Sequence, residues 1–286
     1  MDFTLHSCKI ISNSLDSFIM YRCLPQQGLA LANELVAEGC TTFTFGEVEK
    51  RLGKSKTATA NLLKRMENVG LVDRVRRGHY VVRQLGVLGT PAAAESVALS
   101  VGAALDGVSH RIAYRSALYE NDLLVHPTRS IQVAAVRRIR TRSLSDWPLQ
   151  VVIESPEKIG VGRMPWGASH ISDRHRAVLD VARRPRLVGG IEVLAEAFAA
   201  AAYELDAEIL MDYARRLGWS AALRRLGSLA GALALEPLQG FLLPIRPITA
   251  DLDLEPGTGE PTVWRDSRWR VRWQRSVDEL LAVTGH

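Results

Sequence analysis

Residues 54–82, KSKTATANLLKRMENVGLVDRVRRGHYVV, decide the fold of the first part of this 286-residue chain. Ser55 can cap a helix at its start, and Gly70 can end it. The buried face of this helix is predicted from helical spacing to consist of Ala58, Leu62, Met66 and Val69. Two short runs of β-type residues follow, joined through an Arg-Arg-Gly turn in which Gly78 is expected to need a positive φ. The stretch therefore predicts a helix followed by a β-hairpin.

Two further helices are predicted upstream of this stretch. An apolar stripe of helical spacing runs from Gln26 and ends at Gly39. Thr44 and Glu47 have the spacing of a capping box, and Gly53 can close the short helix that follows. Three helices and a hairpin, in this order, are the plan of a winged helix-turn-helix domain, whose last helix fits the major groove of DNA. Some domains of this plan bind proteins instead.

The predicted DNA-contacting residues lie on the third helix, opposite its apolar stripe, and around the hairpin tip. Lysine and arginine neutralise phosphates, whereas threonine and asparagine donate hydrogen bonds to phosphates or base edges. The set consists of Lys54, Ser55, Lys56, Thr57, Thr59, Asn61, Lys64, Arg74, Arg76, Arg77 and His79. The alternative is a solvated basic surface with no partner.

The distribution of charge favours the DNA interpretation. Arginine is abundant along the whole chain, but only six of the 36 basic residues are lysines, and four of these lie between Lys50 and Lys64. Residues 54–83 hold eight basic and two acidic side chains, a net charge of +6, whereas the whole chain carries +5. The positive field is therefore concentrated on this segment, as expected for a nucleic-acid partner.

The remaining sequence predicts a larger mixed domain, so that the chain is expected to be an α+β protein of two domains, residues 1–88 and 89–286. Strand-like runs come first, and a strongly helical segment follows from about residue 173 to residue 235. Near the C-terminus, Trp269, Val271 and Trp273 alternate with Arg268, Arg270 and Arg272, which predicts a strand with a tryptophan face in the core.

No enzyme motif is found in the sequence. The seven histidines are scattered, and there is no nucleophile elbow, phosphate-binding loop or dinucleotide-binding glycine pattern. Asp251, Asp253 and Glu255 alternate as acids around a metal could, but they read more simply as a strand end with a polar loop. We therefore expect no catalytic residue, no metal and no cofactor. The absence of a signal peptide, of a membrane-spanning segment and of metal-type cysteine spacing predicts a cytoplasmic protein without a membrane partner.

Three stretches of the chain carry a family resemblance. They are HRIAYRSALYENDLL (110–124), SIQVAAVRRIRTR (130–142) and SDRHRAVLDVARRPRLVGGIEVLAEAF (172–198). Together they resemble AbiEi-type antitoxins, the regulator-like partners in type IV, abortive-infection toxin–antitoxin pairs of bacteria. Arg176 to Asp180 stand where the family has Arg-Thr-Leu-Leu-Asp, with Pro185 and a Gly-Gly pair following in order. YRSAL (114–118) is similar to another family motif, although Glu120–Asn121–Asp122 replace the usual His-Gly-Leu.

The resemblance implies a transcriptional repressor that binds its own operator, with an inverted repeat as one arrangement. It also implies an antitoxin that counters a nucleotidyltransferase toxin, with or without a direct complex. Arg137, Arg138, Arg140 and Arg142 are candidates for secondary DNA or toxin contacts, or for a solvated loop. Two alternatives stay open: a winged-helix regulator with a ligand-sensing C-terminal domain, and a nuclease-like enzyme with a buried carboxylate cluster.

Overall fold

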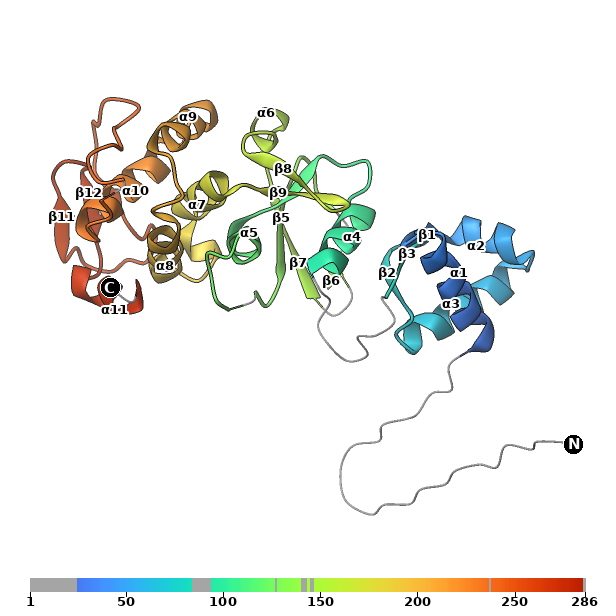
Figure 1. Cartoon of the computed structure of the whole chain (residues 1–286). Coiled ribbons are helices and arrows are strands. Elements are labelled where there is room, and N and C mark those ends of the chain that lie inside the picture. The colour runs from blue at the N-terminus through green and yellow to red at the C-terminus, as the bar shows by residue number, and fades with distance from the viewer. Residues whose placement is uncertain are drawn as a thin grey trace, which may run out of the picture.

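The computed structural model describes residues 25–83, 94–126, 128–139, 143–144, 147–236 and 238–284. The predicted boundary between residues 88 and 89 lies outside these ranges, as do Arg140 and Arg142. We refer to residues 25–83 as the N-terminal unit and to residues 94–284 as the C-terminal unit. Figure 1 shows the N-terminal unit beside one end of the C-terminal unit.

The three helices and the hairpin of the N-terminal unit follow in the order that the sequence predicts, and a short strand that it does not predict lies between the first two helices. Its elements are α1 (Gln26–Ala37), β1 (Thr42–Thr44), α2 (Phe45–Leu52), α3 (Lys56–Asn68), β2 (Val72–Arg76) and β3 (His79–Val82). The strands form an antiparallel sheet of order β1-β3-β2. A small core joins the sheet to the helices, and the rings of Phe43 and Tyr80 stack within it at 5.5 Å between centroids.

Local sequence explains where these elements start and stop. The Thr44 hydroxyl accepts a hydrogen bond from the Glu47 amide while the Glu47 carboxylate accepts one from the Thr44 amide, a complete capping box at the start of α2. Gly53 then ends α2 with φ +59°, and the Ser55 hydroxyl accepts from the Ala58 amide to cap α3. In the hairpin turn Gly78 has φ +78°, as predicted.

The first part of the C-terminal unit is a mixed six-stranded sheet of order β6-β7-β5-β4-β9-β8. Its strands are β4 (His110–Ile112), β5 (Ile131–Ala135), β6 (Ser143–Leu144), β7 (Trp147–Ile153), β8 (Arg163–Trp166) and β9 (Ser169–Ser172). Three helices accompany them: α4 (Ala94–Ala104), α5 (Tyr114–Glu120) and α6 (Pro156–Ile159). β5 pairs in parallel with β7, and β4 in parallel with β9, while the other neighbours are antiparallel.

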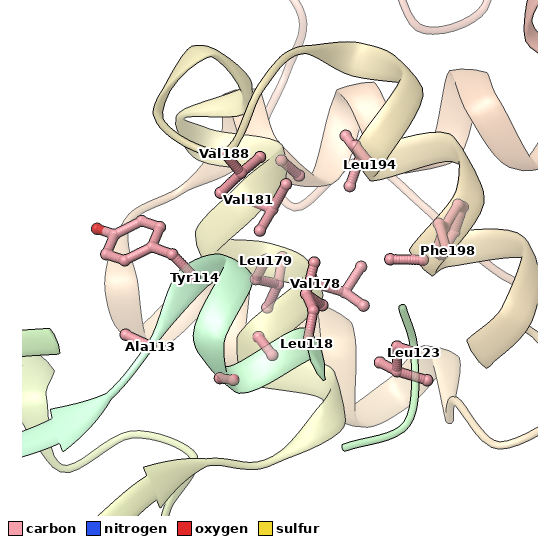
Figure 2. Packing of buried hydrophobic residues seen from close by; sticks show 14 of the residues in the cluster. Ala113, Tyr114, Leu118, Leu123, Val178, Leu179, Val181, Val188, Leu194 and Phe198 are labelled. Atoms are coloured by element: carbon pink, nitrogen blue, oxygen red, sulfur yellow. The ribbon is translucent and has the colours of Figure 1, made fainter. Parts of the chain in front are cut away.

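A helical layer follows the sheet. It consists of α7 (Arg174–Arg183), the short 3₁₀ helix η1 (Pro185–Leu187), α8 (Ile191–Ala201), α9 (Ala207–Leu217) and α10 (Ser220–Ala232). The aliphatic side chains of α5, α7 and α8 meet in a continuous core (Figure 2), in which Leu118, Val178 and Leu194 are all fully buried. Figure 2 shows the hydroxyl of Tyr114 pointing away from these side chains.

A small three-stranded sheet packs near the C-terminus. Its strands are β10 (Leu252–Asp253), β11 (Trp264–Asp266) and β12 (Val271–Trp273), and α11 (Val277–Thr284) follows. Trp269, Val271 and Trp273 are buried, as the alternation predicts. The predicted single strand is instead a hairpin, because residues 267–270 form a turn in which Arg270 has φ +51°.

The two units meet at the hairpin. One face of β2–β3 carries Val72, Tyr80 and Val82 into the core of the N-terminal unit. The opposite face carries Val75 and Val81, which are 1% and 2% exposed, into the core of the C-terminal unit. β2 and β3 contact α4, and β2 also contacts β6. The hairpin is therefore held between the two units.

Helices and strands mix in both units, so the α+β class predicted from the sequence is confirmed. Within the described residues, no helix has both the length and the apolar character needed to cross a lipid bilayer.

Candidate nucleic-acid interface

Helix α3 presents a polar face to solvent because its apolar side chains are drawn into the small core. Leu62, Leu63 and Met66 are at most 1% exposed. The opposite face carries exposed side chains whose types suit phosphates and base edges. These are Lys56, Thr57, Asn61 and Lys64, all predicted contact residues.

The prediction for Thr59 is wrong. Thr59 is fully buried, and its hydroxyl has no hydrogen-bond partner in the structure, whereas Ala58 is exposed. The buried stripe is centred between Leu62 and Leu63, so that Thr59, three and four residues before them, lies on the buried face. The prediction left Leu63 out of the apolar stripe, and it therefore placed Ala58 on the buried face in the position that Thr59 occupies.

The residues at the start of α3 have local roles. The Lys54 ammonium, half-buried, donates a hydrogen bond to the side-chain carbonyl of Gln27 in α1. Ser55 is exposed, but its hydroxyl is engaged as the helix cap. Both residues therefore stabilise the N-terminal unit, and they remain candidates for contact with DNA.

The hairpin places further basic residues beside α3. Arg74 and Arg77 are exposed, and Arg76 is the last residue of β2, at a register shift between Arg74 and Arg76. His79 is half-exposed, and its Nδ1 lies 3.3 Å from the carbonyl oxygen of Arg77. Asp73, in the same strand, accepts two hydrogen bonds from Arg83, at 2.7 and 2.8 Å. Both of its carboxylate oxygens are therefore engaged by Arg83.

A groove of about 800 Å³ separates α3 from the hairpin. Its lining combines basic side chains with an aromatic floor and one acid: Phe45, Ala60, Lys64, Glu67, Arg74, Arg77, Gly78 and Tyr80. The pKa of the Tyr80 phenol is raised above its usual value, because burial raises it by more than the nearby charge of Arg74 lowers it. The groove therefore brings predicted residues of the helix and of the hairpin together on one surface.

A second groove, of about 860 Å³, lies on the other side of the hairpin arginines, against the C-terminal unit. It is lined by Arg74, Val75, Arg77, His79, Ala104, Val108, Arg137, Arg138, Ile139 and Ser143. No carboxylate is among these residues. We call this hollow the seam groove. It unites the predicted hairpin residues with Arg137 and Arg138, which are exposed and follow β5.

The arginines of these two grooves differ from those that hold carboxylates elsewhere in the molecule, such as Arg111, Arg176 and Arg272. Within the described part of the chain, none of Arg74, Arg77, Arg137 and Arg138 forms an ion pair. Exposed guanidinium groups without a carboxylate partner are suited to bind an anion, and phosphate takes two parallel hydrogen bonds from such a group.

The arginine stripe near the C-terminus has a different role. Arg265 and Arg270 both bond to Asp251, at 2.9 and 2.8 Å, and Arg272 lies 2.8 Å from Asp253. The acids that could have held a metal are thus occupied by arginines. Among the described residues, no group of three or more histidine, cysteine, aspartate or glutamate side chains is arranged to hold a metal ion.

A charged cluster is buried at the junction of the large sheet and α7. Arg176 and Asp180, four residues apart on α7, form an ion pair with Nε and Oδ1 2.9 Å apart. Sequence reasoning missed its surroundings: Arg111 bonds to both Asp180 and Glu154, and Arg176 also bonds to Glu154. Burial alone raises the pKa of Asp180, but Arg111 and Arg176 together lower it below its usual value.

This cluster does not supply a substrate site. The four side chains are at most 3% exposed, and the oxygens of both carboxylates accept bonds from guanidinium groups. The Ser172 hydroxyl lies 3.3 Å from Asp180 and donates to the Ile112 carbonyl at 3.1 Å. Two positive and two negative charges, closed to solvent, tie strand β4 to α7.

Sequence reasoning also missed that Val75 and Val81 position the candidate interface. The alternation in the hairpin leaves apolar residues on both of its faces, which indicates packing on both sides. That pattern could have predicted a partner surface for the hairpin, although it could not have named α4.

The comparisons with known proteins support the fold alone. No protein-family model matches the chain, and no curated protein matches it either. The structure is similar to the crystal structure of the RV2827C protein from Mycobacterium tuberculosis, with a TM-score of 0.65 and 14% sequence identity. The similarity covers 93% of this chain and 97% of that one.

Proposed function

We propose that the N-terminal unit is a winged helix-turn-helix domain that binds duplex DNA through α3 and the β2–β3 hairpin. The observation that carries this proposal is the groove between them. Exposed Lys64, Arg74 and Arg77 converge there, and exposed Asn61, three residues before Lys64 on α3, can pair with an adenine edge. A helix with free polar side chains next to a basic hairpin is the arrangement that reads a major groove while holding the backbone.

The biological role that we propose follows from the sequence resemblance. The protein represses its own operon and acts as the antitoxin of a nucleotidyltransferase toxin, without catalysis of its own. A regulator with a ligand-sensing C-terminal unit is the alternative. The hollow beside Gly227 and Trp269 does not favour it, because its volume of about 80 Å³ is below the roughly 300 Å³ of a small-molecule site.

The test of DNA binding uses the double substitution Lys56→Ala and Asn61→Ala in the full chain. The probe is a fluorescent duplex from the DNA upstream of the protein's own operon, and the measurement is the dissociation constant by anisotropy. We expect the double variant to lose about tenfold or more in affinity, because a phosphate contact and a base contact worth about 1–3 kcal/mol are removed.

A matched control removes one cation and one amide elsewhere. Arg216→Ala with Gln239→Ala changes exposed residues of the C-terminal unit that line neither groove. The control is expected to bind as the unmodified protein does. Equal binding by both double variants would contradict the proposal. Rescue of growth during co-expression with the neighbouring toxin gene tests the antitoxin role separately.

A further inference from the structure

The seam groove is built by both units. Arg74 and Arg77 come from the hairpin, and Arg137 and Arg138 come from the segment after β5. Its apolar lining includes Val75, which is 1% exposed and belongs to the core of the C-terminal unit. The walls of the groove therefore cannot move apart without exposing this core.

The arginines on the two walls are not neutralised. Among the described residues that line the seam groove none is acidic, and these four guanidinium groups form no ion pair within the same part of the chain. Several arginines elsewhere in the C-terminal unit are arranged differently, since they hold carboxylates at 2.6–2.9 Å. Like charges gathered at a rigid groove attract an external anion.

Arg74 and Arg77 line both grooves, so the two hollows lie on either side of the same side chains. A basic path thus runs from Lys64 on α3, past Arg77, to Arg138 on the C-terminal unit. A polyanion with regularly spaced charges can follow this path and engage both grooves at once. An acidic protein segment in the seam groove would instead compete with DNA for Arg74 and Arg77.

We infer that Arg137 and Arg138 form a second phosphate-binding site, and that the DNA duplex bound by α3 continues past the hairpin onto the C-terminal unit. The inference rests on the proposed function, because it extends the same bound duplex. Contacts to phosphates position a protein on DNA but carry no base information. The site therefore adds affinity and salt dependence and leaves sequence preference to α3.

The experiment measures the dissociation constant of the operon-upstream duplex over a series of salt concentrations. The variant is Arg137→Gln with Arg138→Gln in the full chain. Each phosphate contact contributes about 0.9 to the slope of log affinity against log salt, so we expect the slope to fall by about 2. The loss of affinity between 50 and 200 mM salt should then shrink by about tenfold. The ratio of affinities for the operator and a scrambled duplex should stay unchanged.

Two controls fix the interpretation. Arg137→Lys with Arg138→Lys keeps both charges and should keep the slope, since lysine also binds phosphate as a point charge. Arg215→Gln with Arg216→Gln removes two exposed arginines of α9, far from the seam groove, and should bind as the unmodified protein does. Hydroxyl-radical footprinting should show protection lost on one flank of the site only.

The outcomes separate this inference from the proposed function. An unchanged slope in the glutamine variant, with binding lost on Lys56→Ala and Asn61→Ala, overturns the inference alone. The same holds for an unchanged slope with loss of rescue from the toxin, which would make the groove a protein contact. A changed sequence preference would also overturn it, because the contact would then be to bases. Absence of binding by the unmodified protein would remove both proposals together.

Discussion

Four arginines line the seam groove, and four of the five arginines in and beside the small C-terminal sheet have the opposite arrangement of charges around them. In the sheet and the segment after it, Arg265, Arg270, Arg272 and Arg275 all hold carboxylates. In the groove, Arg74, Arg77, Arg137 and Arg138 face a lining whose described residues include no acid. The abundance of arginine in the sequence therefore says little about binding. What matters is the local supply of acceptors: arginines that meet carboxylates, or backbone carbonyls as Arg224 and Arg225 do, hold the chain together, and the others remain available to an external anion.

Breaking the charge balance where it is most deeply buried should have the largest effect. Asp180→Asn leaves the guanidinium groups of Arg111 and Arg176 with one carboxylate between them in a site closed to solvent. Removing one partner from a buried ion cluster costs about 3–5 kcal/mol in the free energy of unfolding. Urea denaturation followed by circular dichroism measures this loss, and Asp253→Asn, at an exposed pair, serves as the control. A loss as small as that of the control would show that the cluster is not what stabilises this junction.

The same cluster shows how far the sequence leads. The spacing of Arg176 and Asp180 predicts their contact, because residues four apart on a helix lie on one face. The spacing does not reveal that Arg111 and Glu154 complete the cluster, since these residues are brought together by the pairing of distant strands. The order of the three helices and the hairpin, the helix caps and the positive φ of Gly78 are local properties and could be predicted, whereas β1 could not, because it forms by pairing with the distant strand β3.

In the predicted interface, too, the positions set by local helix periodicity were predictable and those set by long-range packing were not. The exposed positions Lys56, Thr57, Asn61 and Lys64 follow from helical periodicity, whereas Thr59 was misplaced because a shift of one residue turns a helix by about 100°. The meeting of Arg77 with Arg137 depends on the packing of Val75 and Val81 against the C-terminal unit. No periodicity in the sequence gives the position of one unit relative to the other.

A buried histidine, His110, sharpens the comparison, because no carboxylate is among the groups that shift its pKa. The His110 ring bonds to the Val108 carbonyl at 2.7 Å and to the Ser169 hydroxyl at 2.9 Å. Burial lowers the pKa of His110, the Val108 carbonyl raises it in part, and the charges of Arg163 and His170 lower it further. The unfolded chain, with a histidine pKa of about 6.5, therefore takes up the proton first as the pH falls. Stability should be constant above about pH 6.5 and decline below it, by at most about 1.4 kcal/mol per pH unit.

Denaturation at several pH values between 5 and 8 measures this dependence. Burial also lowers the pKa of His170 and His175, which remain in a His110→Gln variant. The difference in slope between the two proteins therefore isolates His110, and the variant should have the shallower decline. Identical slopes would mean that His110 stays charged in the folded state, as Arg111 does.

Adding a carboxylate to the seam groove gives its arginines an ion-pair partner, as the arginines of the C-terminal sheet already have. Ser143 is exposed and lines the groove with the four arginines, so Ser143→Asp offers these arginines an internal partner. We expect the salt slope of duplex binding to fall by about 1 and affinity at low salt to fall severalfold, without loss of stability. Ser143→Asn has the same shape without the charge and should bind as the unmodified protein does. If the asparagine and aspartate variants bind alike, the groove does not face the phosphates.

Removing a carboxylate from the C-terminal sheet is the converse and the smallest change. Asp251 accepts hydrogen bonds from both Arg265 and Arg270, and these bonds lower its pKa to about 2, so it is ionised throughout the neutral range. Asp251→Asn releases two guanidinium groups at the surface and should add weak, sequence-independent affinity for a scrambled duplex, about twofold to fourfold, with a salt slope steeper by about 1. Asp266→Asn makes the same change in net charge at a carboxylate that accepts from the Trp269 amide. If net charge alone governed binding, the two variants would gain the same affinity for the scrambled duplex. A gain in affinity confined to Asp251→Asn would show that arginines released from their carboxylate create an anion-binding surface.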